Sequence, residues 1–147
     1  MQARIRNDRS IWTFILYSLL TFGIYEIWYY HKIVKDVNVI CEEDGKRSPG
    51  VFLYIVLTIL SCGIYNVIWW CNMHDRMRAT AKTKNIIIEQ TTSGLMLLHI
   101  GSYFIPILTF VAIHKFLVTL NDMATAYNRE NGYYNRSHET IKPLYHR

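Results

Sequence analysis

Three long stretches of this chain carry almost no charge. They are the apolar runs Ile11–Tyr30, Val51–Cys71 and Leu95–Ile113, and all 16 Lys and Arg residues lie outside them. Of the 11 acidic residues, only Glu26 lies inside one of the runs. About 20 nearly uncharged residues are needed to cross the ~30 Å hydrocarbon core of a bilayer as a helix, whereas a soluble core is assembled from shorter amphipathic pieces. The pattern therefore predicts an all-α integral membrane protein.

The first two apolar runs contain nearly the same sequence. SLLTFGIYEIWYYHK (Ser18–Lys32) aligns with TILSCGIYNVIWWCN (Thr58–Asn72) when Gly23 is placed on Gly63, a shift of 40 positions (63 minus 23). Such self-similarity at a fixed period indicates a tandem repeat. The first two units are therefore expected to share one helical structure.

A third and more divergent copy follows. IPILTFVAIHK (Ile105–Lys115) aligns with FGIYEIWYYHK (Phe22–Lys32), and Pro106 takes the place of Gly23. We therefore expect three apolar helical units, about 9–45, 47–85 and 91–128, within a single membrane domain, 1–128. Each unit should contain a break, and the breaks should lie near Gly23, Gly63 and Pro106. A polar C-terminal tail, 129–147, is expected to follow.

These residues also carry a resemblance to a known family. The order of an Arg-Ser opener, LLTFGIYEIWYY, KDVNVI, SPGVFLYIVLTILSCGIYNVIWW and FLVTLNDMATAYN resembles an uncharacterised family of small bacterial membrane proteins. Its signature is a paired Thr-x-Gly-Ile-Tyr-x-x-x-Trp, and the likeness covers roughly Arg9 to Asn128. Here the second copy has Ser61-Cys62 where the first has Thr21-Phe22. The resemblance implies location and architecture, and it implies no reaction, because the family is a domain of unknown function.

The motif itself suggests two structural roles. A glycine in a membrane helix permits a bend or close helix packing, so Gly23, Gly63 and Pro106 are predicted hinge and helix-packing residues. A nearby Thr21 or Ser61 hydroxyl can bond a carbonyl that the bend releases. Tryptophan and tyrosine collect at the level of the lipid headgroups. The predicted membrane-interface anchors are therefore Trp28, Tyr29, Tyr30, Trp69 and Trp70, although ordinary helix packing of these rings is the alternative.

Two topologies fit the three units. If each unit crossed the bilayer, both faces would carry basic segments, which conflicts with the usual excess of Lys and Arg on the cytoplasmic side. If each unit turned back at its break, every basic segment would be cytoplasmic, but an arm such as Ile11–Phe22 reaches only about 18 Å. An uninterrupted helix from Ile11 to Tyr30 reaches about 30 Å. Span length thus favours crossing helices kinked at the glycine, and the charge pattern favours re-entrant hairpins.

Candidate chemistry within the runs is limited to Glu26, Asn66 and His99. Ionisable groups inside a membrane usually face a partner or a water-filled path. We find no Ser-His-Asp arrangement, phosphate-binding loop or paired carboxylates, so we expect no catalytic residues, no cofactor and no metal site. The features favour a non-enzymatic protein that acts through self-assembly, partner binding or bilayer shaping. The alternatives are a small transporter or channel subunit with Glu26 and His99 on a polar path and, less favoured, a lipid-modifying enzyme.

The expected partners follow from charge and size. The net charge of +5 comes from basic residues strung between apolar runs. This distribution suits anionic lipid headgroups better than nucleic acid. A chain this small, with Gly, Ser and Thr in its apolar runs, is expected to form a homo-oligomer or to bind another membrane protein. The expected location is the bacterial plasma membrane, in a multi-pass or re-entrant arrangement.

Overall fold

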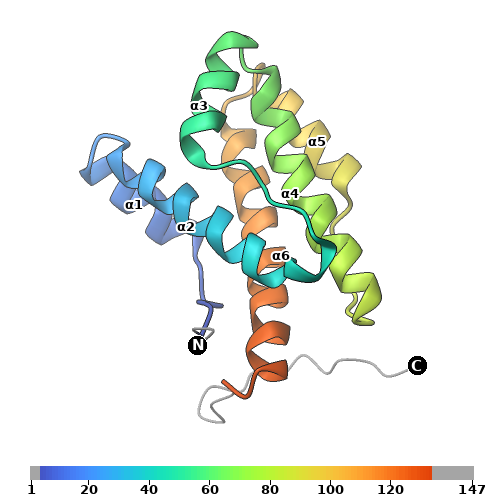
Figure 1. Cartoon of the computed structure of the whole chain (residues 1–147). Coiled ribbons are helices and arrows are strands. Elements are labelled where there is room, and N and C mark those ends of the chain that lie inside the picture. Colours follow the sequence, from blue (N-terminus) through green and yellow to red (C-terminus); the bar gives the residue numbers. More distant parts are fainter. Residues whose placement is uncertain (1–3, 134–147) are drawn as a thin grey trace.

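The computed structural model of the chain describes residues 4–133, and these residues form helices joined by short connections. The helices are arranged as three hairpins, each with a short first helix and a longer second helix (Figure 1). They are α1 (Ile11–Leu20) with α2 (Ile24–Ile40), α3 (Val51–Leu60) with α4 (Ile64–Thr83), and α5 (Thr92–Gly101) with α6 (Ile107–Glu130). A single 3-10 turn, η1 (Glu42–Asp44), joins the first hairpin to the second.

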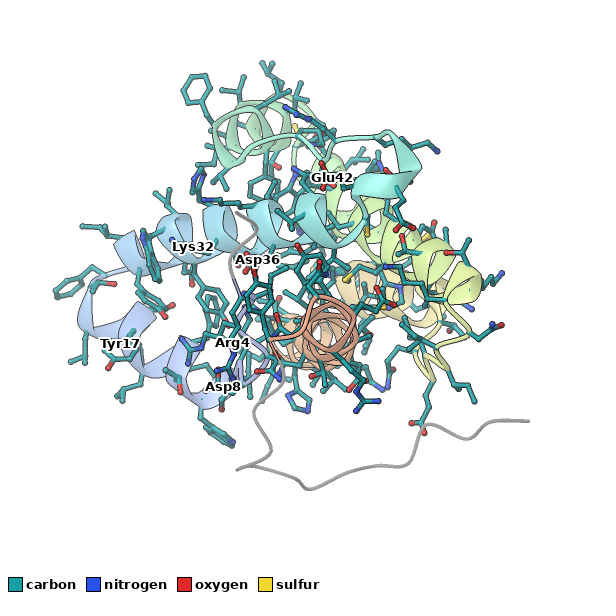
Figure 2. All side chains as sticks on the ribbon, turned by 60° about the horizontal axis from the view of Figure 1, so that its bottom comes forward. Arg4, Asp8, Tyr17, Lys32, Asp36 and Glu42 are labelled. Carbon is teal, nitrogen blue, oxygen red and sulfur yellow. The ribbon has the colours of Figure 1, made fainter. Side chains whose placement is uncertain are left out.

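The three hairpins close into a ring. The long helices α2, α4 and α6 contact one another pairwise, and each short helix packs on its own long helix. Each short helix also packs on the long helix of the preceding hairpin: α3 on α2, α5 on α4, and α1 on α6. In Figure 2, where the bottom of Figure 1 is turned toward the viewer, α6 is nearly end-on and α2 and α4 pass beside it. The tandem repeat therefore folds as a ring with approximate threefold symmetry.

The core lies between the long helices and is built from large side chains. In α2 it uses Ile33, Val34 and Val37, which helical spacing gathers on one face. In α4 the core contains Trp69 and Trp70 together with methionines, and α6 supplies the longest buried face. The largest fully buried side chains are Trp69, Trp70, Phe14, Phe116, Ile33, Met73, Met77, Leu117, Leu120, Met123, His74 and His99.

The predicted breaks near Gly23, Gly63 and Pro106 are present. α1 ends at Leu20 and α2 begins at Ile24, with the same three-residue gap between α3 and α4, and Pro106 immediately precedes α6. Of the two arrangements that the sequence left open, a helix that continues past the glycine with a kink is not what the structure shows, because the chain reverses at Gly23 and Gly63 and the two helices of each hairpin pack against each other. Each short helix spans about 15 Å, from ten residues at 1.5 Å each.

By length and composition, α6 alone among the described helices could cross a membrane. Of its most apolar 18-residue stretch, 44% is buried inside the protein. The short helices α1, α3 and α5 are apolar but have only ten residues each. Three spanning helices are therefore not found.

The predicted polar tail 129–147 falls mostly outside the described residues. Its first two residues belong to α6, which continues to Glu130 instead of ending at Asn128. Nothing in the described part of the chain tests the remainder of that prediction.

Candidate functional site at the hairpin tips

The turn of each hairpin is an exposed apolar surface, which we call a hairpin tip. Phe22, at the first tip, is 97% exposed, and Phe104, at the third, is 84% exposed. The other exposed apolar side chains at the tips are Leu19, Leu20, Ile24, Ile59, Leu60, Ile64, Tyr103, Ile105 and Ile107. A soluble protein rarely leaves so many neighbouring large apolar side chains in water. The tips are therefore the part of the molecule that most requires a partner.

The Thr-x-Gly sequence encodes the reversal at the first tip. Gly23 N–H donates to Ser18 O at 2.9 Å and Phe22 N–H donates to Leu19 O at 3.4 Å, the two bonds of a Schellman helix end. The second tip repeats these bonds at Gly63 and Cys62, and at both tips two consecutive residues have positive φ. The motif is therefore repeated because each copy turns the chain.

One hydroxyl serves both helices of the first hairpin. Thr21 Oγ1 donates to Tyr17 O at 2.7 Å, which satisfies a carbonyl at the end of α1, and accepts from Tyr25 N–H at 3.0 Å at the start of α2. Ser61 occupies the same position in the second hairpin and accepts from Tyr65 N–H at 2.8 Å. Tyr17 O is not a released carbonyl, since it also accepts from Thr21 N–H at 3.1 Å, so the predicted bond to a freed carbonyl is found only in part. What the hydroxyl supplies is an acceptor for a first-turn N–H of the next helix, which explains its position two residues before the glycine.

The second and third tips touch. Tyr103 Oη donates to Gly63 O at 2.6 Å, and a Cβ added at Gly63 would lie 2.8 Å from that oxygen. At Gly23, by contrast, an added Cβ would meet nothing within 4 Å. Only the second of the two predicted hinge glycines therefore lies against a neighbouring hairpin. In Figure 1 the tips of the second and third hairpins lie at the top of the molecule, and the tip of the first hairpin lies at the left.

The aromatic anchors are placed differently from the prediction. Trp69 and Trp70 are each 1% exposed, and Trp70 packs edge-on against Phe116 at 4.7 Å between ring centroids. Tyr29 is also buried, and Tyr30 contacts Trp69 and Trp70. The anchor role predicted for Trp69, Trp70 and Tyr29 is wrong, because the ring of hairpins encloses these side chains.

Trp28 is the predicted anchor that the structure leaves on the surface. Its ring is 52% exposed, and the Lys32 ammonium lies 5.6 Å from its centroid. Trp12, at the start of α1, is another exposed tryptophan, which the sequence analysis did not select.

The three polar candidates do not form one site, and only two of them are equivalent positions of the repeat. Glu26 and Asn66 are equivalent residues of the first two hairpins, and Asn66 Oδ1 accepts from Tyr54 Oη at 2.9 Å. His99 is 1% exposed, stacks on Trp70 at 5.8 Å, and has no hydrogen-bond partner at either ring nitrogen within the described chain. No hydrogen bond therefore links His99 to Glu26.

Sequence reasoning did not predict the polar contacts that hold the hairpins together. Asn121 on α6 brackets the backbone of Arg9, accepting from its N–H at 3.1 Å and donating to its carbonyl at 2.9 Å. Asn38 on α2 brackets Ser48 in the same way. The signal was present, because Asn38 and Asn121 are equivalent positions at the shift of 83 that relates units one and three (121 minus 38).

Two ion pairs lie beside these asparagine contacts and add to the bonding between elements. Arg9, which is buried, donates to Asp36 on α2. Asp36 is labelled in Figure 2. Arg76, the repeat equivalent of Asp36, donates at 2.7 and 3.0 Å to the carboxylate of Asp44. This bonding lowers the pKa of the Asp44 carboxyl. Positions 36 and 76, which are equivalent in the repeat, therefore each form an ion pair. The residue is acidic in the first unit and basic in the second.

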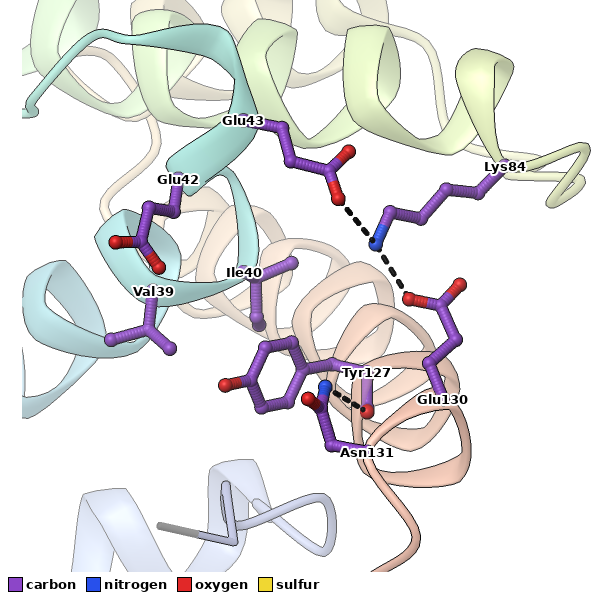
Figure 3. Close-up of a pocket in the computed structure, with 8 residues that line it drawn as sticks. All are labelled: Val39, Ile40, Glu42, Glu43, Lys84, Tyr127, Glu130 and Asn131. Carbon is purple, nitrogen blue, oxygen red and sulfur yellow. Dashed lines mark hydrogen bonds and ion pairs between the residues drawn. The ribbon is translucent and has the colours of Figure 1, made fainter. Parts of the chain in front are cut away.

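The long helices end around a shallow pocket at the opposite side from the tips. Its volume is about 350 Å³, and its lining residues are Val39, Ile40, Glu42, Glu43, Lys84, Tyr127, Glu130 and Asn131 (Figure 3). Lys84 Nζ donates to Glu130 at 2.6 Å and lies 3.8 Å from Glu43. Burial lowers the pKa of Lys84, but the hydrogen bond to Glu130 and the negative charges of Glu130 and Glu43 together outweigh this, and the pKa is raised. The pocket therefore lies where the ends of the three hairpins meet, and its ion pairs connect them.

Comparison with known families fits this three-unit structure. The model of a family described as a domain of unknown function, DUF4234, matches residues 9–79 and again residues 49–122. The chain belongs to the DUF4234 family. The two DUF4234 matches overlap at residues 49–79, which include most of the second hairpin. No curated protein and no solved structure matches the chain.

Proposed function

We propose that this DUF4234 protein is a non-enzymatic membrane protein that inserts its three hairpin tips into one leaflet of the bilayer and thereby shapes it. The observation that carries the proposal is the set of three apolar ten-residue helices, each ending in an exposed apolar turn. Their length of about 15 Å matches half of the ~30 Å hydrocarbon core. Insertion to the middle of the bilayer would cover the tips without exposing any helix to the opposite leaflet.

The distribution of charge supports entry from one side. Counted along the long helices, the basic residues nearest to a tip are Lys32 and Lys115, each eight positions beyond the first residue of its helix. Every other described Lys and Arg lies closer to the chain termini or to the connections between hairpins. Since basic segments stay in the cytoplasm, the inserted leaflet is the cytoplasmic one. A plasma membrane is the location that fits this arrangement.

A backbone within the hydrocarbon core must satisfy its own hydrogen bonds, and internal bonds at the first two tips reduce this cost. The Schellman bonds there use groups at the end of the short helix, and the Thr21 and Ser61 hydroxyls accept from amides at the start of the long helix. A turn exposed to water would not need this degree of internal bonding.

Single-leaflet insertion has a mechanical consequence. Six helices, each roughly 10 Å across, would expand one leaflet while the other stays unchanged. A leaflet expanded in this way bends the bilayer. Of the three non-enzymatic roles expected from the sequence, bilayer shaping therefore follows most directly from the geometry. A polar path for transport has weaker support, because Glu26 and His99 lie on different hairpins without a hydrogen bond between them.

Reconstitution into vesicles tests the proposal. Vesicle diameter, measured by electron cryo-microscopy, should fall as the ratio of protein to lipid rises. The variant Phe22→Asp places a carboxylate at the most exposed tip, where insertion would cost roughly 2.5–3.5 kcal/mol. It should keep its helicity but lose much of the effect, while the control Phe22→Leu should keep it. Vesicle diameters that do not depend on the protein would refute bilayer shaping.

A further inference from the structure

The ring of hairpins places two basic pairs at one level. His31-Lys32 on α2 and His114-Lys115 on α6 occupy equivalent positions at the shift of 83 (115 minus 32). Equivalent positions of a ring-shaped repeat lie at the same height along its axis. The third equivalent position, on α4, is Cys71-Asn72 and carries no charge. The structure therefore has a level with two basic positions and one neutral position.

The height of this level follows from helix geometry. Lys32 is eight residues beyond Ile24, and Lys115 is eight residues beyond Ile107, so each lies about 12 Å along its helix from the tip. Half of the hydrocarbon core is about 15 Å thick, and a lysine side chain can extend its ammonium toward the interface. With the tips at the middle of the bilayer, both ammonium groups reach the headgroup layer.

The side chains at this level are available to a ligand. His31, Lys32 and His114 are exposed, and Lys115 is half-buried with its ammonium donating to Gln90 Oε1 at 3.0 Å. Asp36, the acidic residue one turn beyond Lys32, is bound by Arg9. The Lys32 ammonium lies over the ring of Trp28, a residue that suits the interface.

We propose that Lys32 with His31, and Lys115 with His114, bind the phosphates of anionic phospholipids at the rim of the inserted tips. This inference rests on the proposed insertion and names the lipid class that the inserted protein prefers. A lysine near an anionic membrane surface contributes about a fivefold preference. The uncharged Cys71-Asn72 position should show no such preference.

Quenching of tryptophan by brominated lipids tests the proposal. The chain has four tryptophans, and because Trp69 and Trp70 are buried, the variant Trp12→Phe leaves Trp28 as the exposed reporter beside Lys32. In mixed bilayers at equal mole fraction, brominated phosphatidylglycerol should compete for the Trp28 site about five times better than brominated phosphatidylcholine. The preference should decline in high salt, since the charges are at the surface.

Two further variants in the Trp12→Phe background make the test specific. Lys32→Gln should abolish the preference at Trp28, whereas Lys82→Gln, at the exposed far end of α4, should leave it unchanged. Inorganic phosphate should displace no more lipid than chloride of equal ionic strength.

The outcomes separate this inference from the proposed function. Equal quenching by the two lipids, or an equal loss in Lys32→Gln and Lys82→Gln, would overturn the headgroup site and leave insertion standing. Absence of quenching by either lipid would contradict insertion itself.

Discussion

Replacement of Gly63 by alanine should destabilise the fold more than the same replacement at Gly23. Both glycines have positive φ, +93° and +88°, a conformation that costs a residue with a Cβ about 1–2 kcal/mol. At Gly63 the new Cβ would also lie 2.8 Å from Tyr103 Oη, which donates to the Gly63 carbonyl. Loss of that hydrogen bond adds about 1 kcal/mol. We therefore expect about 2–3 kcal/mol for Gly63→Ala and about 1–2 kcal/mol for Gly23→Ala.

The assay is reversible unfolding in detergent micelles, followed by circular dichroism. A double-mutant cycle isolates the contact, because Tyr103→Ala removes the atom that the new Cβ would meet. In the Tyr103→Ala background, Gly63→Ala should cost no more than Gly23→Ala does in the wild-type protein. Equal costs for the two glycine variants in the wild-type background would refute the contact between the second and third tips. So would an unchanged cost of Gly63→Ala once Tyr103 is removed.

Three other predictions concern single side chains. Arg76→Gln should lower the free energy of unfolding by about 2 kcal/mol, because it removes the hydrogen bonds that Arg76 donates to Asp44, Asn38 and Ser48, whereas the neighbouring Arg78→Gln should change it by less than about 0.5 kcal/mol in the same assay. Burial, with a smaller contribution from Arg78, lowers the pKa of His74 to about 4. The unfolded chain therefore binds a proton below pH 6.5 that the folded chain does not, and stability falls as pH decreases from 6.5 toward 4. Between pH 7 and pH 5, the free energy of unfolding should fall by on the order of 2 kcal/mol more in the wild-type protein than in His74→Gln. Equal pH slopes for the two proteins would contradict this. Cys62 has φ +50° without being glycine, so Cys62→Gly should raise the unfolding midpoint, whereas Cys62→Ala should not.

The sequence predicted the local structure of the repeat well. Hydrophobic runs and the repeated glycine located the breaks, since a glycine two residues after a hydroxyl is a local signal that needs no long-range information. Whether the break was a kink or a reversal was harder to predict, because the reversal depends on positive φ at Phe22 and Cys62, residue types that do not favour it.

The arrangement of the hairpins was not predictable in the same way. Trp69 and Trp70 follow the same motif as the exposed Trp28, and the packing of α4 against its neighbouring helices, α3 included, decides that they are buried. Arg9 and Asn121 lie far apart in the sequence, and their contact depends on closure of the ring. Such pairs become visible from sequence only when equivalent positions of the three units are compared directly.

Cysteine labelling of the protein in its native membrane tests single-leaflet insertion most directly. In a background without native cysteines, single cysteines at Ser10, Lys46 and Lys84 report on the connections and helix ends, and native Cys62 restored alone reports on the second tip. An impermeant maleimide should label Ser10, Lys46 and Lys84 in inverted vesicles and not in intact cells. Cys62 should react from neither side until detergent is added, although its side chain is exposed in the protein. Labelling of Lys46 from the face opposite to Ser10 and Lys84, or of Cys62 from water, would contradict the account.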